Sequence, residues 1–194
     1  MIKKILIGLV ALVLLLVGAS AYILTHPPTE LAHDSERGEE AHGNAEVTQE
    51  ATAEAAERDF LEHMIPHHGE AVATAQTIVE RSNNAEVKDL AQAIIAAQET
   101  EITNMKDWYQ TWYGSEFKAD GDYHVMMPDL SGKTGAELDR AFLEGMIEHH
   151  FAALNKAQEV APYIQHDEIR TLVKNIAETQ SAEMVKMRVL LKQI

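Results

Sequence analysis

Two pairs of adjacent histidines occupy positions where a helical pattern calls for apolar side chains. Each pair ends a Met-Ile-x-His-His motif, so a thioether lies three and four residues before the imidazoles and shares a helix face with them. Imidazole suits copper and zinc, and an added thioether favours Cu(I). The spacing therefore predicts a site for a soft metal ion. The motif residues are Met64, His67, His68, Met146, His149 and His150.

The two motifs belong to an internal repeat. Adding 82 to a residue number aligns one half of the chain with the other without a gap. The repeat keeps polar positions as well as core positions. Beyond the motifs, the shared polar and sulfur-bearing pairs are Gln98 with Gln180, Glu101 with Glu183, and Met105 with Met187.

Helical periodicity predicts an all-α fold. Apolar pairs recur at 3.6-residue spacing from near Val47 to Arg81, which predicts a long first helix with a wide core-facing stripe. The next helix begins after Asn84, a residue suited to an N-cap, and ends at Gly114. The third helix repeats the first pattern and stops near Pro162, and a fourth helix follows it.

Two such hairpins, each with one apolar face, bury those faces most simply against each other. We therefore expect an antiparallel four-helix bundle with a pseudo-two-fold axis over residues 46–194. The first repeat covers about 58–114 and the second about 140–194. A connection rich in glycine, over about 115–134, joins them.

Counting from the turns places the polar positions at one height. If the first hairpin turns near residue 83, antiparallel neighbours sum to about 167, which sets Gln98 level with His68 and Glu101 within a turn of His67. The second hairpin gives the same result, so we expect one polar cross-section. The candidate metal ligands are Met64, His67, His68, Glu101, Met105, Met146, His149, His150, Glu183 and Met187. Weaker candidates are His63, Gln98, His124, Met126, Met127 and Gln180.

Other interpretations of this cross-section remain open. Buried imidazole and carboxylate groups cost several kcal/mol unless they are hydrogen-bonded or metal-bound, roughly speaking. The same residues could satisfy one another in a polar layer that fixes helix register, with no metal. A ferritin-type di-iron site needs Glu-x-x-His on helices, a spacing found only in the expected tether at Glu30/His33 and Glu39/His42. Zinc stays a candidate if only His and Glu coordinate. The loop group of His124, Met126 and Met127 either binds a second ion or packs over the bundle.

The N-terminus predicts export. Lys3 and Lys4 precede an apolar run over 5–24, which serves either as a cleaved signal peptide or as an uncleaved membrane anchor. Either way the lysines stay in the cytoplasm and the remainder lies beyond the inner membrane, in the periplasm or outside the cell. Residues 25–45 are rich in Pro, His, Glu and Gly without periodicity, which predicts a flexible acidic tether.

Composition excludes several classes of partner and site. The 194 residues carry a formal net charge of −15, which repels phosphate backbones and argues against nucleic acid as a partner. The chain has no cysteine, so a disulfide or thiolate metal site is excluded and any ion must use nitrogen, oxygen or thioether ligands.

The motifs resemble the family catalogued as domain of unknown function 305. Its marks are Phe-x-x-x-Met-Ile-x-His-His and, on the next helix, Gln-x-x-Glu-(Ile/Met)-x-x-Met. They stand here as Phe60–His68 with Gln98–Met105, and as Phe142–His150 with Gln180–Met187, within a resemblance that spans about Arg58 to Leu191. The resemblance implies a ferritin-like bundle, usually exported. It also implies copper binding through His and Met, as in the CopM-type members.

Three functions compete at this point. The leading expectation is an exported protein that binds Cu(I), with Ag(I) and zinc as other candidate ions, and sequesters copper or passes it to other copper-handling proteins. The second is a metalloenzyme with Glu101 or Glu183 as general base, although no nucleophile triad or phosphate loop supports catalysis. The third is an interaction module whose polar layer is purely structural.

Overall fold

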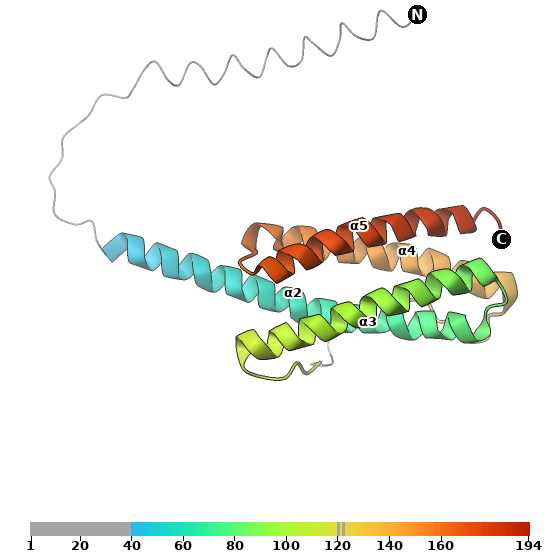
Figure 1. The fold of residues 1–194 in the computed structure, drawn as a ribbon, viewed down its shortest axis with the longest axis horizontal. Helices are drawn as coiled ribbons and strands as arrows, with labels where there is room; N and C mark the ends of the chain where they lie inside the picture. The colour runs from blue at the N-terminus through green and yellow to red at the C-terminus, as the bar shows by residue number, and fades with distance from the viewer. Residues whose placement is uncertain (1–39, 120, 122) are drawn as a thin grey trace, which may run out of the picture. The chain divides into compact units, whose positions relative to one another are not determined.

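Helices account for all the regular structure of the described residues. The computed structural model describes residues 40–194 apart from 120 and 122, with side chains from residue 51 onward. The expected signal or anchor segment, 1–24, and most of the expected tether lie outside this range. None of the described helices is long and apolar enough to cross a bilayer. The elements are α2 (Glu40–Arg81), α3 (Ala85–Tyr113), α4 (Gly135–Val160), the 3-10 turn η1 (Ala161–Tyr163) and α5 (Asp167–Leu190) (Figure 1).

The ends of α3 follow from local chemistry. Asn84 precedes the helix in an extended conformation, and its Oδ1 accepts hydrogen bonds from the amides of Glu86 and Val87 at 3.0 and 3.3 Å. Gly114 ends the helix in the left-handed region at φ 67°, where a side chain would be strained. Both boundaries confirm the sequence prediction. In contrast, α2 begins at Glu40, earlier than the start near Val47 that the periodicity predicts.

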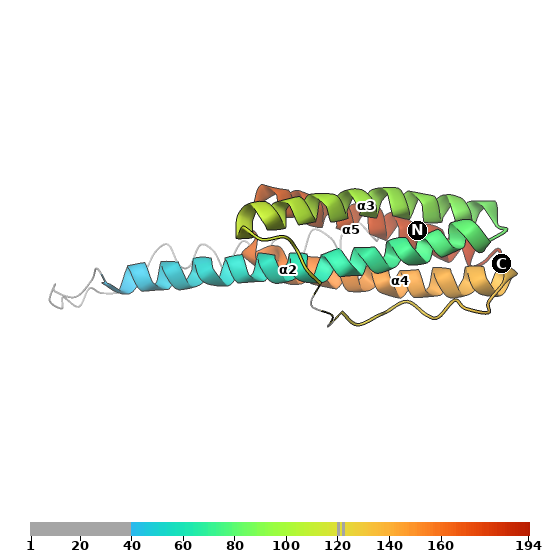
Figure 2. The same ribbon diagram turned by 90° about the horizontal axis from the view of Figure 1, so that it is seen from below.

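The four long helices form two antiparallel hairpins that lie side by side. The α2–α3 hairpin packs beside the α4–α5 hairpin, with α2 next to α4 on one face and α3 next to α5 on the other (Figures 1 and 2). The connection after Gly114 runs back along the bundle, so α4 starts at the same end as α3 and runs parallel to it. One long crossover of this kind is typical of ferritin-like bundles.

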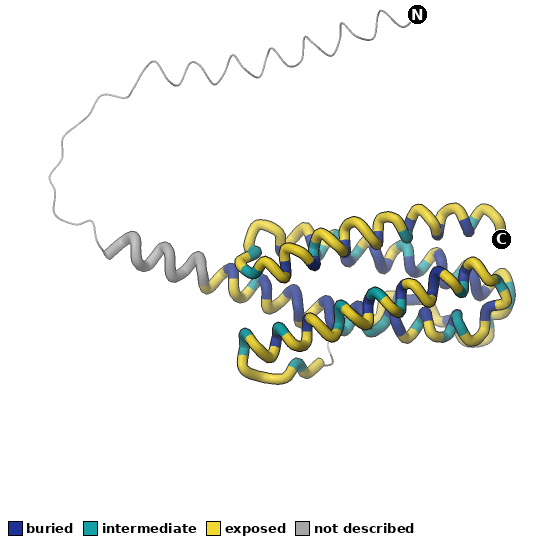
Figure 3. The backbone as a smooth tube through the Cα atoms, in the orientation of Figure 1, coloured by how far each residue is buried: buried dark blue, intermediate teal, exposed yellow. Residues whose placement is uncertain are grey.

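The core consists of two apolar clusters with the histidine pairs between them. Along α2, Phe60 and Met64 belong to one cluster and Ala71 and Ile78 to the other. The buried positions face inward along all four helices (Figure 3). Since a fully buried large apolar side chain contributes about 1.5–3 kcal/mol, these clusters supply the packing that holds the polar layer in place.

The crossover loop packs closely on α4 at Gly145. A Cβ atom placed on Gly145 would overlap the ring of Pro128, with Cγ at 2.9 Å, and would lie 3.2 Å from Cε of Met127. Gly145 is the repeat counterpart of His63, so the two halves differ here. In the second half the loop covers the position, whereas in the first half His63 is exposed.

Replacing Gly145 by alanine is expected to destabilise the protein by about 1–3 kcal/mol, because the overlap with a ring fixed to the backbone forces the loop to shift. Gly69, in α2, is the matched control because nothing lies within 4 Å of a Cβ there. Gly69→Ala should stabilise the protein by about 1 kcal/mol through helix propensity alone. Urea unfolding of both variants gives the comparison. Equal stabilisation in both would show that the loop does not rest on Gly145.

Candidate metal centre

The two-fold relation of the hairpins brings His67 and His149 face to face. Each sits on the core-facing stripe of its helix, between the apolar clusters, with an exposure of 1%. Their ring centroids lie 3.7 Å apart at an interplanar angle of 31°. The sequence prediction placed both histidines at one height. The structure brings the two rings into contact.

The second histidine of each pair is held by a carboxylate from the neighbouring helix of its own hairpin. Nε2 of His68 lies 2.8 Å from Oε2 of Glu101, and Nε2 of His150 lies 2.7 Å from Oε2 of Glu183. An ionised carboxylate accepts a proton from Nε2, which leaves Nδ1 as the nitrogen with a free lone pair. Carboxylates commonly orient metal-binding histidines in this way. Glu101 and Glu183 therefore act on the histidines, which differs from the direct ligand role expected for them from sequence.

Polar atoms without hydrogen-bond partners concentrate in this layer. Among the described residues ten buried side-chain nitrogen and oxygen atoms lack a partner, and eight of them belong to the layer. They are both ring nitrogens of His67 and His149, Nδ1 of His68 and His150, and Oε1 of Gln98 and Gln180. Native proteins leave few buried polar atoms unsatisfied, and each such atom costs about 1–3 kcal/mol. The layer is therefore not the self-satisfied hydrogen-bond network that a structural role requires.

Burial keeps the central histidines neutral. It lowers the pKa of His67 to about 2, and the neighbouring His149 lowers it further. Burial also lowers the pKa of His149, to about 4, against an opposing effect of the nearby Glu70 carboxylate. A neutral imidazole is the form that binds a metal ion. The chemistry of the donor set thus fits a metal whose ligands are uncharged nitrogens.

Glu70 is a site residue that the sequence analysis missed. Its Oε2 lies 3.3 Å from Nε2 of His149, although the alignment is not that of a hydrogen bond, and it accepts one from the Tyr123 hydroxyl at 2.5 Å. Its Oε1 accepts hydrogen bonds from the amides of Met126 and Met127 at 2.8 and 2.7 Å. Glu70 thereby joins the crossover loop to the histidine layer. The available signal was its place three residues after His67, on the same helix face.

The four methionines expected beside the histidines are fully buried in the apolar clusters. Met64 and Met105 belong to one cluster, and Met146 and Met187 to the other. They flank the polar layer from both sides, as the spacing predicted. Whether their sulfur atoms bind an ion stays a prediction.

The weaker candidates are distributed over different environments. Gln98 and Gln180 are buried at 2% exposure within the layer. His63 is exposed, with its ring centroid 6.2 Å from that of His67. His124 and Met126 are exposed in the loop, whereas Met127 is buried against the core and Gly145. The structure thus uses Met127 for packing, which is one of the two roles expected for this loop group.

No three His, Asp or Glu side chains of the described residues already converge in a geometry ready to hold an ion. The stacked arrangement of His67 and His149 explains part of this finding, because parallel rings direct their nitrogen lone pairs alongside one another. An ion bound between them would require the rings to rotate.

The fold and this layer define a four-helix bundle with a buried, duplicated histidine centre. The model of the family described as "Domain of unknown function (DUF305)" matches residues 57–191, and the chain belongs to this family.

Solved structures agree with this assignment. CopM in its Cu(II)-bound form is 32% identical, with a TM-score of 0.65 over 70% of this chain and 95% of that chain. CopM has also been solved in Cu(I)-bound and silver-bound forms. A DUF305 fragment from Deinococcus radiodurans is 26% identical, with a TM-score of 0.64 over 72% of this chain and 97% of that one. A protein of Acanthamoeba polyphaga mimivirus, "Uncharacterized protein L153", is 39% identical over 49 residues, which make up 25% of this chain and 32% of that relative.

Proposed function

We propose that this protein binds Cu(I), and Ag(I) as a similar soft ion, outside the cytoplasm, and that it sequesters copper or passes it to other copper-handling proteins. The observation that carries the proposal is the set of eight buried, unpartnered nitrogen and oxygen atoms in one layer of the bundle. A layer of this composition costs stability in the metal-free protein, and coordination of an ion would offset that cost.

The ligands in this proposal are the ring nitrogens of His67 and His149 with Nδ1 of His68 and His150. Glu101 and Glu183 fix the tautomer and orientation of the last two rings. Met64 and Met146, one turn away from the histidines on the same helices, supply the thioethers that favour Cu(I) over zinc. Such a centre binds a soft ion and shields it from water.

Two further observations support the proposal. CopM, a member of similar fold and 32% identity, has been solved with Cu(I), with Cu(II) and with silver. The N-terminal sequence, with Lys3 and Lys4 before an apolar run over 5–24, is typical of an exported chain. Copper outside the inner membrane is therefore the ion and the location that fit the chain best.

The test is a titration of the purified protein with Cu(I) in competition with a chelator of known affinity. The variant in which His67, His68, His149 and His150 all become alanine should bind Cu(I) at least about 100-fold more weakly, a loss of about 2.7 kcal/mol. The matched control, His63→Ala/His124→Ala, removes two exposed histidines and should bind as the wild type does. Equal affinity in the wild type and the fourfold variant would rule out the histidine layer as the site.

A further inference from the structure

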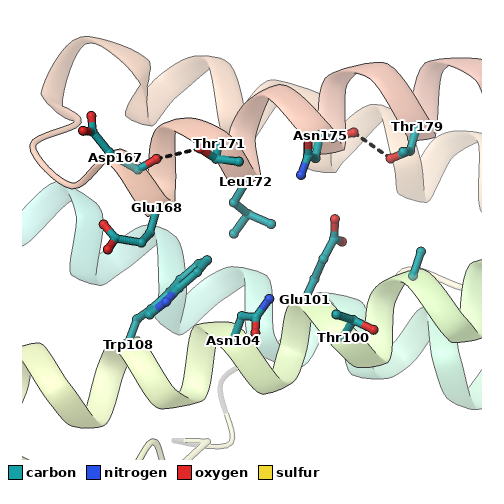
Figure 4. Close-up of a pocket in the computed structure, with 11 residues that line it drawn as sticks. Thr100, Glu101, Asn104, Trp108, Asp167, Glu168, Thr171, Leu172, Asn175 and Thr179 are labelled. Carbon is teal, nitrogen blue, oxygen red and sulfur yellow. Dashed lines mark hydrogen bonds between the residues drawn. The ribbon is translucent and has the colours of Figure 1, made fainter.

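A groove of about 610 Å³ separates α3 from α5 on the face opposite the crossover loop. Its walls come from residues 97–108 of α3 and 167–179 of α5. Figure 4 shows the side chain of Glu101 reaching from α3 into the space between the two helices, with Asn175 facing it from α5. The groove therefore extends from the surface to the carboxylate that holds His68.

Every ionised side chain that lines this groove is acidic. Glu101, Asp167 and Glu168 contribute carboxylates, and no Lys or Arg takes part in the lining. Asp167 is paired with Arg170 at 3.4 Å, so its charge is partly balanced. Glu168 has no hydrogen bond or ion pair to a described residue and keeps its full charge toward the groove. A cleft lined by one sign of charge concentrates ions of the opposite sign.

Glu101 connects this groove with the buried layer. Its side chain is 16% exposed, whereas that of His68, 2.8 Å away, is fully buried. Directly behind the carboxylate, Nδ1 of His68 is buried and has no partner. An ion in the groove therefore meets one carboxylate that touches both solvent and a free imidazole nitrogen.

Two other approaches to the layer are less suited to a cation. On the α2–α4 face Glu70 already accepts three hydrogen bonds from the crossover loop, and Arg81 lines the hollow beside it. Glu183, the repeat counterpart of Glu101, has Lys186 three residues after it, where α3 has Asn104. Both alternatives place a positive charge beside the approach.

We infer that the α3–α5 groove is the route by which metal cations reach and leave the histidine layer, with Glu101 as the residue that passes them to His68. This inference rests on the proposed function, because the route has a purpose only if the layer binds an ion. Glu168 increases the local cation concentration, and Glu101 exchanges its contact with His68 Nε2 for one with the incoming ion.

The test measures the rate at which Cu(I)-loaded protein releases the ion to an excess of bathocuproine disulfonate, an anionic chelator too large for the groove. Asn175→Trp narrows the groove opposite Glu101, and Asn175→Lys places a positive charge there. Each should slow release by about tenfold. Asn175→Trp should leave the equilibrium affinity for Cu(I) unchanged, because the route affects both directions equally. At about 1 M salt the effect of Asn175→Lys should largely disappear.

Ala177 supplies the matched controls, since it is exposed on the same helix and does not line the groove. Ala177→Trp and Ala177→Lys should release Cu(I) at the wild-type rate. If the wild type binds Cu(I) and both Asn175 variants release it as fast as the Ala177 variants, the groove is not the route, although the proposed function stands. If the wild type binds no Cu(I), the proposed function is overturned and the route with it.

Discussion

Replacing His67 and His149 together by leucine should stabilise the metal-free protein and remove most of its affinity for Cu(I). All four ring nitrogens of these residues are buried without partners, and each unsatisfied group costs about 1–3 kcal/mol. Leucine has a similar volume and no polar atom, so the free energy of unfolding should rise by about 2 kcal/mol or more. Urea unfolding in the presence of a chelator gives this change, and a competition titration gives the affinity.

The matched control for this variant is Met64→Leu/Met146→Leu, which exchanges one apolar pair for another in the same helices. It should cost less than about 1.5 kcal/mol, because volume-conserving apolar exchanges are tolerated. A gain in stability with a loss of function is the behaviour expected of a binding site. If the histidine-to-leucine variant were instead destabilised by about 2 kcal/mol or more, the layer would be a satisfied structural network, and the interaction-module hypothesis would be favoured.

The metal-free protein should lose about 4 kcal/mol of stability between pH 6.5 and pH 4.5 through these two histidines alone. The folded-state pKa is about 2 for His67 and about 4 for His149, against a model value of 6.5. The unfolded chain therefore binds protons that the folded chain does not, so stability falls as the pH drops below about 6.5. Each histidine contributes ~1.4 kcal/mol per pH unit while the pH lies between its two pKa values.

Urea unfolding at pH 7.5, 6.5, 5.5 and 4.5 with chelator present would measure this dependence, at about one-unit spacing across the window. The leucine variant is the control, because it retains every carboxylate and lacks the two histidines. Its stability should fall less steeply over the same range, by about 4 kcal/mol in total. Identical pH profiles for both proteins would show that the two rings are already protonated or solvated in the folded state.

The repeat made much of this fold predictable. Periodicity located the helices, and local chemistry at Asn84 and Gly114 located both ends of α3. The polar layer was also predictable, because His68 and Glu101 stand at equal heights in any antiparallel hairpin that turns near residue 83. Arithmetic along two helices suffices for contacts of this kind.

Contacts that depend on the crossover loop could not be predicted in the same way. Glu70 has Ala152 as its repeat counterpart, so the internal comparison gave no reason to select it. Its partners Tyr123, Met126 and Met127 lie more than fifty residues away in sequence, and only the path of the loop brings them together.

Glu57 was missed for a related reason. It is a fully buried carboxylate on α2 that accepts hydrogen bonds from the amides of Gln165 and His166 before α5. An acidic residue on a helix is usually a solvated one, so composition predicted exposure. The start of α5 depends on this carboxylate, which satisfies two amides where no side chain caps the helix.

The most direct test of the metal centre is anomalous diffraction from crystals of the Cu(I)-loaded protein, recorded above and below the copper absorption edge. The expected result is an anomalous peak between α2 and α4, at bonding distance of about 2 Å from ring nitrogens of His67 and His149. The two rings should have rotated out of the stacked arrangement that they adopt at 3.7 Å in the metal-free structure. Peaks confined to exposed residues such as His63, His124 and Met126, with the stacked pair unchanged, would contradict a copper centre in the histidine layer.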